Sequence, residues 1–483
     1  MNGWTLREIA RAVDGSWVVE PGEGAAAPVG ASFDTRDLAR GQLFAAFVGA
    51  QVDGHDYLSV AEARGAALVL VTDTEKVPEG YGVPTLVVDD VLAALTTLGV
   101  MWRQRLNAKV IGVTGSNGKT TTTRMIAAAL SGGAGSGRVH APKKSYNNAL
   151  GVPISILNAP MDSDFVVQEI GTSSEGEIGA RSALVKPDVS VITSIGHAHL
   201  AELGSTMGVA QEKASILSHT ESLGIVTGES GELDGVIEGM SIRCEIDRVS
   251  SDDVRVVESG AERVVFEVRG DRFEVPVPGM HNARNAAMAV LVARALGVDD
   301  DSIRAGLAHA KLPEMRLDRV VIPASSAPIV VFNDAYNANP DSVRAAVSFF
   351  ESLDIPGRRV AVLGDMLELG GATEREHMAL LSELVGESVI DRFVLVGPEM
   401  ERAHVHVGGG SKKFESIGSM SDSALTSVAR SIREGDTVLL KGSRGVKLER
   451  LVYMLINQHT SRAGRALRID PSTNAPAVDD GAS

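Results

Sequence analysis

This chain of 483 residues has a single cysteine, fewer basic than acidic residues (46 against 62) and no long apolar run. One cysteine cannot form a disulfide framework, which fits a reducing compartment, and we expect Cys244 to be a small, partly buried side chain rather than a catalytic one. The formal net charge of −16 argues against a nucleic-acid-binding protein, whose surface would carry a basic stripe. An anionic small-molecule substrate is not excluded, because a few local Lys and Arg side chains can hold one.

The sequence also lacks the hydrophobic segments of secreted and membrane-spanning proteins. No apolar run reaches the roughly 18 residues of a transmembrane helix. Residues 1–15 have the pattern of an amphipathic helix, with Leu6, Ile9 and Val13 on one side, and contain no secretory h-region. We therefore expect a cytoplasmic protein without membrane insertion.

Length and hydrophobic periodicity predict an α/β protein of several domains. The 483 residues suggest about three domains, and the hydrophobic share of 44% suffices for a core in each. Strands that alternate with helices indicate parallel, doubly wound sheets. We predict a small N-terminal α/β domain over 1–107, a central domain with a doubly wound parallel sheet over 108–322, a C-terminal Rossmann-like α/β domain over 323–470, and a disordered tail over 471–483.

Individual elements are predicted from apolar runs and their boundaries. Helices are expected over 91–106 and 281–296, and a charged, β-rich segment over 242–278. The expected strands are 67–72, 85–88, 165–169, 189–193, 224–227, 329–332, 359–363, 393–396 and 437–441, with a further strand starting at 109.

The segment V-I-G-V-T-G-S-N-G-K-T-T-T-T, residues 110–123, passes from an apolar strand through a glycine turn into a helix. Such a turn lets backbone N–H groups point at phosphate oxygens, and the helix presents its positive end to the same anion. Lys119 can reach the β- and γ-phosphates, and the Thr120 hydroxyl can hold Mg²⁺. The nucleotide-binding residues expected here are Gly115, Ser116, Asn117, Gly118, Lys119, Thr120 and Thr121.

The motif is a variant of the P-loop, because the strict pattern has glycine where this chain has Val113. The alternative is a glycine-rich turn without special use. Strand, loop and helix occur in the required order, which favours phosphate binding.

Polar residues follow the next strands along the chain. Glu169 ends the predicted strand 165–169, and ligands of open α/β sheets bind beyond the carboxyl ends of strands, so Glu169 can share a Mg²⁺ ion with Thr120. The alternative is a solvated loop glutamate. After strand 189–193, either His197 or His199 could bind a metal or cap a loop. Lys213 has apolar neighbours in a predicted helix and, by itself, is indistinguishable from a solvated helix lysine.

Six motifs together are highly specific. They are T-G-S-N-G-K-T-T at 114–121, N-N-A-L-G-V-P at 147–153, E-I-G…G-E-I at 169–178, A-H-L-A-E-L-G-S at 198–205, K-A-S-I-L at 213–217 and G-M-H-N-A-R-N-A-A at 279–287. In these motifs the chain resembles the Mur ligases, the ATP-dependent amide-forming enzymes of peptidoglycan synthesis, over nearly its whole length.

The resemblance implies ATP and Mg²⁺ as cofactors, and roles for particular residues. It implies that His199 helps to hold a second Mg²⁺, and that Lys213 is carbamylated, which turns a cation into an anionic metal ligand. Asn282 and Asn285 would contact the adenine and ribose side of ATP. Arg316 would approach the terminal phosphate and Asp334 would contact ATP, although an inter-domain salt bridge is the alternative for Arg316. Lys119, His199, Lys213 and Arg316 would be the catalytic residues.

Within the family, the resemblance is to the branch that adds D-alanyl-D-alanine to UDP-N-acetylmuramoyl tripeptide. It is carried by residues 32–57, by D-A-Y-N-A-N-P-D-S at 334–342, by L-G-D-M-L-E-L-G at 363–370 and by L-L-K-G-S-R-G at 439–445. The substrate-binding residues that it implies are Phe33, Thr35, Ala50, Gln51, Val52, Asn147, Asn148, Asn337, Lys441, Ser443 and Arg444. We expect a monomer.

Departures from the family and rival functions remain. Ser145 replaces an asparagine of the family, and T-S-S-E-G-E-I follows Glu169 where the family has another sequence. D-T-R at 34–36 could simply be a turn with an internal Asp–Arg pair. The rivals are a folylpolyglutamate-synthase-like ligase, a P-loop switch or motor ATPase, and a non-catalytic metabolite-binding protein.

Overall fold

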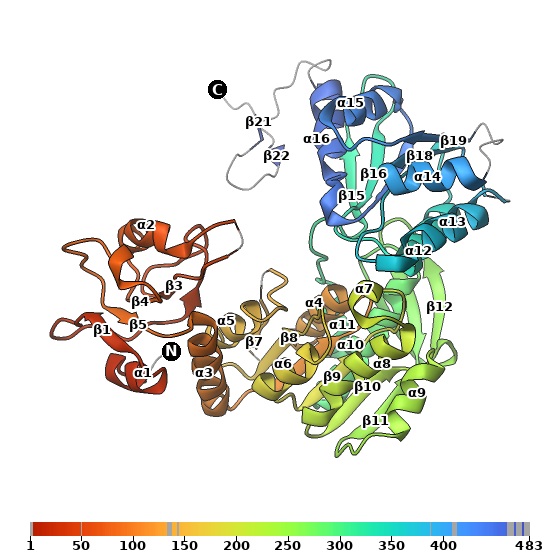
Figure 1. Cartoon of the computed structure of the whole chain (residues 1–483). Helices are drawn as coiled ribbons and strands as arrows, with labels where there is room; N and C mark the ends of the chain where they lie inside the picture. The colour runs from red at the N-terminus through yellow and green to blue at the C-terminus, as the bar shows by residue number, and fades with distance from the viewer. Residues whose placement is uncertain are drawn as a thin grey trace, which may run out of the picture. The chain divides into compact units, whose positions relative to one another are not determined.

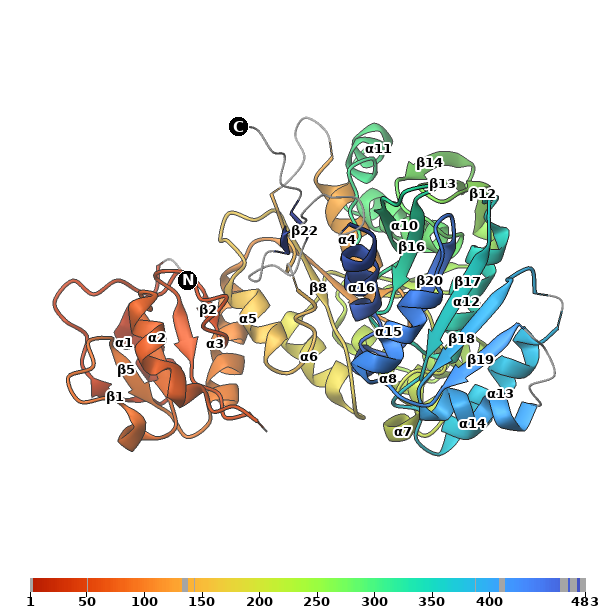
Figure 2. The same ribbon diagram turned by 90° about the horizontal axis from the view of Figure 1, so that it is seen from above.

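The computed structural model describes residues 3–49, 51–132, 138–142, 144–386, 388–407, 413–460, 468–469 and 476–477 (Figures 1 and 2). Ala50 and, apart from 476–477, the predicted tail 471–483 lie outside the described residues. The chain divides into two compact units. The first comprises Met1–Ile195, Ala210–Ser251 and Met288–Leu307, and the second comprises Gly196–Val209, Asp252–Ala287 and Ala308–Ser483.

The first unit begins with a five-stranded sheet in the order β1-β5-β4-β3-β2, in which only β1 runs antiparallel. Its central strand β4, L-V-L-V, is buried on both faces, as is typical of parallel sheets. The strands are β1 (Ser16–Val19), β2 (Ala31–Ser32), β3 (Leu43–Ala45), β4 (Leu68–Val71) and β5 (Thr85–Val87), and the helices are α1 (Leu6–Ala12), α2 (Leu58–Ala63) and α3 (Val91–Arg105).

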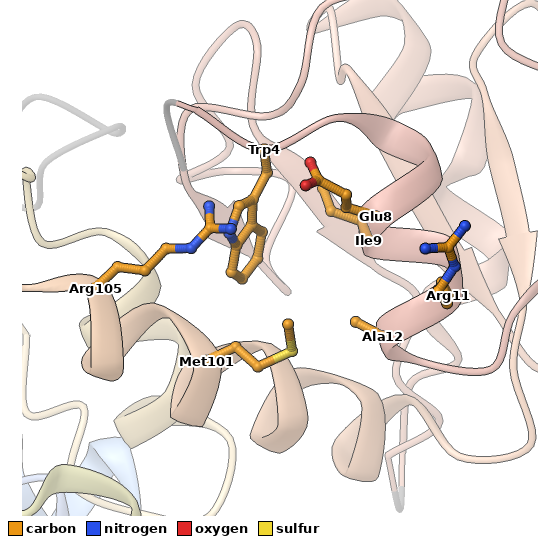
Figure 3. A pocket seen from close by; sticks show the side chains of 7 residues that line it. All are labelled: Trp4, Glu8, Ile9, Arg11, Ala12, Met101 and Arg105. Atoms are coloured by element: carbon orange, nitrogen blue, oxygen red, sulfur yellow. The ribbon is translucent and has the colours of Figure 1, made fainter.

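Helix α1 starts at Leu6 rather than near residue 1, because Thr5 and Glu8 form a capping box that fixes its first turn. The Trp4 ring lies edge-on to Trp102 of α3 at 5.5 Å, and the Arg105 guanidinium lies 5.1 Å from the Trp4 ring centre. Side chains of α1 and α3 line a cavity of about 190 Å³ between the two helices (Figure 3). These aromatic contacts anchor the first helix to α3.

The second sheet of this unit is fully parallel, with the order β11-β10-β9-β6-β8-β7, which confirms the predicted doubly wound sheet. Since β8 and β9 flank β6 on opposite sides, the chain reverses direction across the sheet at β6. The strands are β6 (Lys109–Thr114), β7 (Val139–His140), β8 (Phe165–Glu169), β9 (Val189–Ile192), β10 (Leu223–Thr227) and β11 (Glu245–Val249). The helices are α4 (Lys119–Leu130), α5 (Gly151–Leu157), α6 (Glu177–Val185), α9 (Gly231–Glu238) and α11 (Asp300–Leu307).

The second unit holds an antiparallel three-stranded sheet and a six-stranded sheet in the order β15-β16-β20-β17-β18-β19, where only β15 is antiparallel. The first sheet is formed by β12 (Val254–Ser259), β13 (Val264–Val268) and β14 (Asp271–Val275). The second is formed by β15 (Asp318–Ile322), β16 (Ile329–Asp334), β17 (Arg359–Gly364), β18 (Arg392–Val396), β19 (Phe414–Ile417) and β20 (Thr437–Lys441).

The helices of the second unit are α7 (Leu200–Leu203), α12 (Pro340–Ser352), α13 (Thr373–Leu384), α14 (Pro398–Val407), α15 (Asp422–Ser431) and α16 (Glu449–Thr460). Two helices, α8 (Thr206–Ala214) and α10 (His281–Ala295), begin in the second unit and end in the first. Two short strands, β21 (Arg468–Ile469) and β22 (Pro476–Ala477), pair with each other. Within the described residues, no helix combines the length and apolarity needed to cross a membrane.

The predicted α/β class is confirmed, with strands such as β8 and β20 at the predicted residues. The edge strands β15 and β19 were not predicted. Neither contains a continuous buried run, because β15 alternates in exposure and β19 is only half-buried.

Helix α11 approaches α4, the helix that follows the glycine turn, very closely. A Cβ atom on Gly306 of α11 would lie 2.1 Å from the Ala128 carbonyl oxygen of α4, and one on Gly132 would lie 1.9 Å from the Ser302 carbonyl oxygen. Backbone atoms cannot move aside as a flexible side chain can. The packing of α4 against the rest of its unit therefore requires glycine at both positions.

We expect Gly306→Ala to lower the free energy of unfolding by about 1–3 kcal/mol or more, because it forces two helix backbones apart. Urea denaturation measures the change. Gly235→Ala is the matched control: Gly235 also lies in a helix, α9, but a Cβ there meets nothing within 4 Å, so alanine should stabilise by about 0.5–1 kcal/mol. Equal stabilities of the two variants would contradict the close helix approach.

Candidate active site

The loop that joins β6 to α4 is fastened to the end of the neighbouring strand β9. The backbone N–H of Ser116 donates to the Ser194 carbonyl, and that of Asn117 donates to the Ser194 hydroxyl, each at 2.9 Å. The Thr193 hydroxyl donates to the Thr114 carbonyl at 3.2 Å and also to the Asn117 carbonyl. The course of the loop is therefore set by the residues that follow β9.

Glycine is required in this loop for two separate reasons. Gly115 has φ of 143°, and a Cβ there would lie 2.0 Å from the Thr193 hydroxyl oxygen. Gly118 has φ of 80° and leads directly into α4. The Lys119 ammonium folds back over the loop and donates to the carbonyls of Gly115 at 2.8 Å and Ser116 at 3.3 Å. The structure thus brings the residues predicted to bind phosphate, Gly115 to Thr121, into one turn at the positive end of α4.

Glu169 at the end of β8 is 2% exposed, so it is not a solvated loop residue. One of its carboxylate oxygens accepts from the Thr120 hydroxyl at 2.8 Å, and the other accepts from the Asn147 side-chain amide at 2.6 Å. The side chain of Asn148 instead accepts from the Gly151 N–H at 2.8 Å, at the start of α5. Three residues that the sequence analysis singled out, Thr120, Glu169 and Asn147, therefore meet beside the loop.

Lys213 near the end of α8 is 1% exposed, and its side-chain nitrogen has no hydrogen-bond partner among the described residues. Burial lowers the pKa of Lys213 well below its usual value, and the positive charge of Lys119 lowers it further. The ordinary solvated lysine suggested by the sequence alone is excluded by this burial. Burial and the nearby cation therefore both favour the neutral form of the Lys213 amine.

Glu212 is a charged residue of this region that the sequence analysis missed. It is 4% exposed and accepts from the backbone N–H groups of Gly176 and Ile178, each at 2.7 Å. Its carboxylate therefore fastens the end of α8 to the start of α6.

Arg181 of α6 was also missed. It is 8% exposed, lies 2.8 Å from Glu177 and donates to the Gly171 carbonyl. Burial by itself raises the pKa of Glu177. Hydrogen bonds from the Ser173 and Ser174 N–H groups and the charge of Arg181 have the larger combined effect, so the pKa of Glu177 is lowered to about 2. Helical spacing was the available signal, because Arg181 stands on the stripe of buried residues that includes Ile178, Ser182 and Val185.

The two histidines after β9 belong to the second unit. His199 has a left-handed backbone, φ 56°, and its Nδ1 lies 3.1 Å from a Glu368 carboxylate oxygen. His197 donates its backbone N–H to Asp341 at 2.9 Å, with its Nδ1 3.2 Å from the same carboxylate. Each histidine therefore has a carboxylate partner of its own.

A polar cluster forms where the neighbouring strands β16 and β20 end, at the paired residues Asp334 and Lys441. The Lys441 ammonium is buried, lies 2.7 Å from the Asp334 carboxylate and donates to the Asn337 carbonyl at 2.8 Å. The Arg316 guanidinium lies 4.3 Å from the centre of the Tyr336 ring, which is a cation–π contact.

Four more predicted residues lie elsewhere in the second unit. The Ser443 hydroxyl accepts from the Leu367 N–H at 2.9 Å, and Arg444 pairs with Glu449 at 3.2 Å. At the start of α10, the Asn282 amide donates to the Pro278 carbonyl at 2.6 Å and that of Asn285 donates to Asn282 at 3.0 Å.

In the N-terminal sheet, the predicted substrate residues have mixed surroundings. The Phe33 ring lies 6.0 Å from that of Tyr146, and Thr35 is buried, whereas Gln51 and Val52 are exposed. The internal pair considered for D-T-R does form, with the Arg36 guanidinium 2.7 Å from the Asp34 carboxylate.

Among the described residues, no group of three or more His, Cys, Asp or Glu side chains is arranged to hold a metal ion. Thr120 and Glu169 nevertheless place a hydroxyl and a carboxylate oxygen 2.8 Å apart beside the glycine loop. Oxygen donors of this kind fit Mg²⁺, which keeps several waters and takes its other ligands from substrate phosphates.

Family models match three stretches of the chain. They describe the Mur ligase family catalytic domain over residues 30–99, the Mur ligase middle domain over 113–293 and the Mur ligase glutamate ligase domain over 315–444.

Relatives match over nearly the full length. The UDP-N-acetylmuramoyl-tripeptide–D-alanyl-D-alanine ligase of Bacillus subtilis is 34% identical, over 95% of this chain and 99% of its own. The ligase of the same name from Synechocystis is 32% identical over 88% of this chain and 91% of its own. A crystal structure of MurF from Acinetobacter baumannii matches with a TM-score of 0.79 and 29% identity, covering 94% of this chain and 99% of that one. The chain belongs to the Mur ligase family.

Proposed function

We propose that this chain is the ATP-dependent ligase that joins D-alanyl-D-alanine to UDP-N-acetylmuramoyl tripeptide in peptidoglycan synthesis, with ADP and phosphate as the other products. The observation that carries the proposal is the glycine loop fastened to β9 beside the buried pair Thr120–Glu169. It is supported by full-length similarity to enzymes with this name. We further propose three domains, over 1–107, 108–322 and 323–470, and action in the cytoplasm.

The chemistry explains why a nucleotide loop is needed. A carboxylate does not react with an amine at neutral pH, because its carbon is shielded by negative charge and carries no leaving group. Transfer of the γ-phosphoryl group of ATP to the tripeptide carboxylate gives an acyl phosphate, and the dipeptide amine then displaces phosphate. Such a reaction requires positioning and charge neutralisation more than covalent participation by the protein.

Several residues of the first unit are proposed to bind ATP and to neutralise the charge of the transferring group. Loop N–H groups and the positive end of α4 would bind the phosphates, and the Lys119 ammonium would leave the loop carbonyls to offset the charge of the transferring group. Thr120 and Glu169 would hold Mg²⁺, with Asn147 orienting the carboxylate. The metal supplies charge neutralisation on the phosphates when it is bound.

Lys213 is proposed to be carbamylated. A buried, neutral amine without a partner is the form of lysine that reacts with carbon dioxide, and the product is an anion that suits a metal ligand. An unmodified ammonium beside a divalent cation would be repelled.

In the second unit, the cluster around Lys441 is proposed to bind the dipeptide. Lys441, Ser443, Arg444 and the neighbouring Asn337 offer cationic and polar groups of the kind that recognise a carboxylate. The ATP and metal roles that the resemblance implies for His199, Asn282, Asn285, Arg316 and Asp334 stay predictions, as do the substrate roles of Phe33, Thr35, Gln51 and Val52.

The reaction is tested directly by product mass. Purified protein with ATP, Mg²⁺, UDP-muramoyl tripeptide and D-alanyl-D-alanine should yield the pentapeptide, and ADP release should require both acceptors. Equal ADP release without the dipeptide would contradict ligation and favour a switch or motor ATPase. Activity only with glutamate and a folate would favour a folylpolyglutamate-synthase-like ligase. Comparing tripeptides that have lysine or diaminopimelate at the third position shows which of the two the enzyme accepts.

We expect Gly115→Ala to weaken ATP binding by about tenfold or more, because the methyl group would collide with Thr193 and displace the loop. Isothermal titration with ATP measures the affinity. Gly297→Ala is the matched control: Gly297 also has a positive φ, 82°, but a Cβ there meets nothing within 4 Å. It should cost roughly 1 kcal/mol of stability and leave the ATP affinity unchanged. Parental affinity in Gly115→Ala would show that this loop does not bind the nucleotide.

Lys213→Ala should lower turnover by about 100-fold or more, because an anionic ligand beside the phosphates is lost. A short-chain carboxylic acid should then restore part of the activity by refilling the space. Lys213→Arg should stay inactive, since a guanidinium is not carbamylated and keeps its charge. Lys186→Ala, which removes an exposed lysine of the same unit, is the control and should behave like the parent. A nearly fully active Lys213→Arg enzyme would exclude the carbamate.

A further inference from the structure

We infer that Arg181 is a positioning residue that holds a carbamate on Lys213 through its buried Nε–H, which has no hydrogen-bond partner among the described residues. The inference rests on the carbamylation of Lys213 proposed above, and it assigns a role to a residue on a different helix.

The first observation is the incomplete bonding of a buried arginine. Two guanidinium nitrogens of Arg181 are engaged, one by the Gly171 carbonyl and one by Glu177, but in the part of the chain that the structure describes the buried Nε has no hydrogen-bond partner. Buried N–H groups of a charged side chain are costly to leave unpaired, so an acceptor is expected there.

The second observation is that Lys213 has the same deficiency. Its Nζ is also buried and also without a partner. Glu212 connects α8 with α6. It directly precedes Lys213 on α8, and its carboxylate accepts from the backbone N–H groups of Gly176 and Ile178 at the start of α6. The charge of Arg181 is among those that act on Lys213. Among the described residues, no hydrogen bond joins the Lys213 nitrogen to the Arg181 Nε.

The acceptor for the Arg181 Nε is not supplied by the neighbouring carboxylates. Both oxygens of Glu212 accept backbone N–H groups, and both oxygens of Glu177 accept from Arg181 itself or from the Ser173 and Ser174 N–H groups. Glu169 is likewise engaged, by Thr120 and Asn147. A carbamate would add two new acceptor oxygens and a negative charge at Lys213, where the positive charges of Lys119 and Arg181 act together with the negative charges of Glu212 and Glu177.

The covalent step is balanced without an oxidant or reductant. The lone pair of the neutral Lys213 nitrogen forms an N–C bond to carbon dioxide, and one C=O π pair moves onto oxygen. The nitrogen then loses one proton to water, which leaves a carbamate anion. Arg181 donates to one of its oxygens and so disfavours the reverse reaction.

Carbon-13 NMR of the full-length protein, equilibrated with labelled bicarbonate and without substrates, tests the inference. The parent should show a carbamate carbon signal that is absent in Lys213→Ala. Arg181→Met should need about tenfold or more carbon dioxide to reach half occupancy, as expected for the loss of a charge-assisted hydrogen bond. Arg181→Gln, which keeps a neutral donor, should fall between the two, and circular dichroism checks that each variant is folded.

Arg103→Met is the matched control. Arg103 also binds α6, but at its other end, where it donates to the carbonyls of Val185 at 2.7 Å and Lys186 at 2.8 Å. It should keep the parental carbon dioxide dependence, so a general loosening of α6 is distinguished from the loss of the donor.

The outcomes separate this inference from the proposals on which it rests. Parental carbon dioxide dependence in folded Arg181→Met or Arg181→Gln, beside a clear signal in the parent, would overturn the role of Arg181 alone. An equal loss in Arg103→Met would also overturn it. No carbamate signal in the parent would overturn both the carbamate and the role of Arg181. The ligase reaction, read by product mass, is independent of this measurement.

Discussion

The first unit is organised around a loop in which one position, Gly115, has room only for glycine. Beyond β6, the backbone passes so close to Thr193 that even one methyl group on Gly115 would collide with it. Thr193 and Ser194, which follow β9 on one side of β6, form hydrogen bonds with the loop. Glu169 lies at the end of β8, on the other side of β6. Adjacent parallel strands end at the same edge of a sheet, so the reversal of chain direction at β6 gathers these three segments at one place. The sheet order therefore determines where the proposed phosphate site lies.

Charge is the second organising factor, since the site concentrates ionisable groups that are largely buried. Most are compensated locally: Glu169 by Thr120 and Asn147, Glu212 by two backbone N–H groups, and Glu177 by Arg181. Lys213 is not compensated in this way, because its buried nitrogen has no hydrogen-bond partner among the described residues and Lys119 adds a positive charge. Burial of an uncompensated amine is costly, and such groups are concentrated at functional sites. The proposed carbamylation would place a negative charge at Lys213, which Lys119 and Arg181 would favour and Glu212 and Glu177 would oppose.

Much of this architecture is readable in the sequence, because parallel strands are buried on both faces and appear as continuous apolar runs. F-V-V-Q-E and T-V-L-L-K gave β8 and β20 at their observed residues, and the glycine loop was recognisable from strand, turn and helix in order. The edge strands β15 and β19 were not predicted, because β15 alternates in exposure and β19 is half-buried along its length, so neither contains a continuous apolar run. The shorter α1 could have been anticipated, since T-L-R-E at 5–8 is a capping box.

The candidate site was less predictable, because tertiary burial determines the state of a charged residue. By sequence alone, Lys213 and Arg181 are ordinary helix residues, and only the packing of α6 and α8 shows that both are buried. The position of Arg181 on the buried stripe of α6 was a usable signal. By contrast, nothing in the sequence Q-E-K at 211–213 indicated that Glu212 caps α6, a different helix from its own. Residues at strand ends, such as Glu169 and Asp334, were identifiable because the position itself has a functional meaning in α/β sheets.

The central claim is that ATP activates a carboxylate of the substrate rather than water, and the fate of one oxygen atom tests it most directly. The terminal carboxylate of UDP-muramoyl tripeptide is labelled with oxygen-18, the reaction is run with ATP and D-alanyl-D-alanine, and the phosphate product is weighed by mass spectrometry. Attack of the carboxylate on the γ-phosphorus predicts that each phosphate formed carries one labelled oxygen, because the acyl phosphate breaks between carbon and oxygen. Phosphate without the label, with its new oxygen drawn from water, would contradict the account.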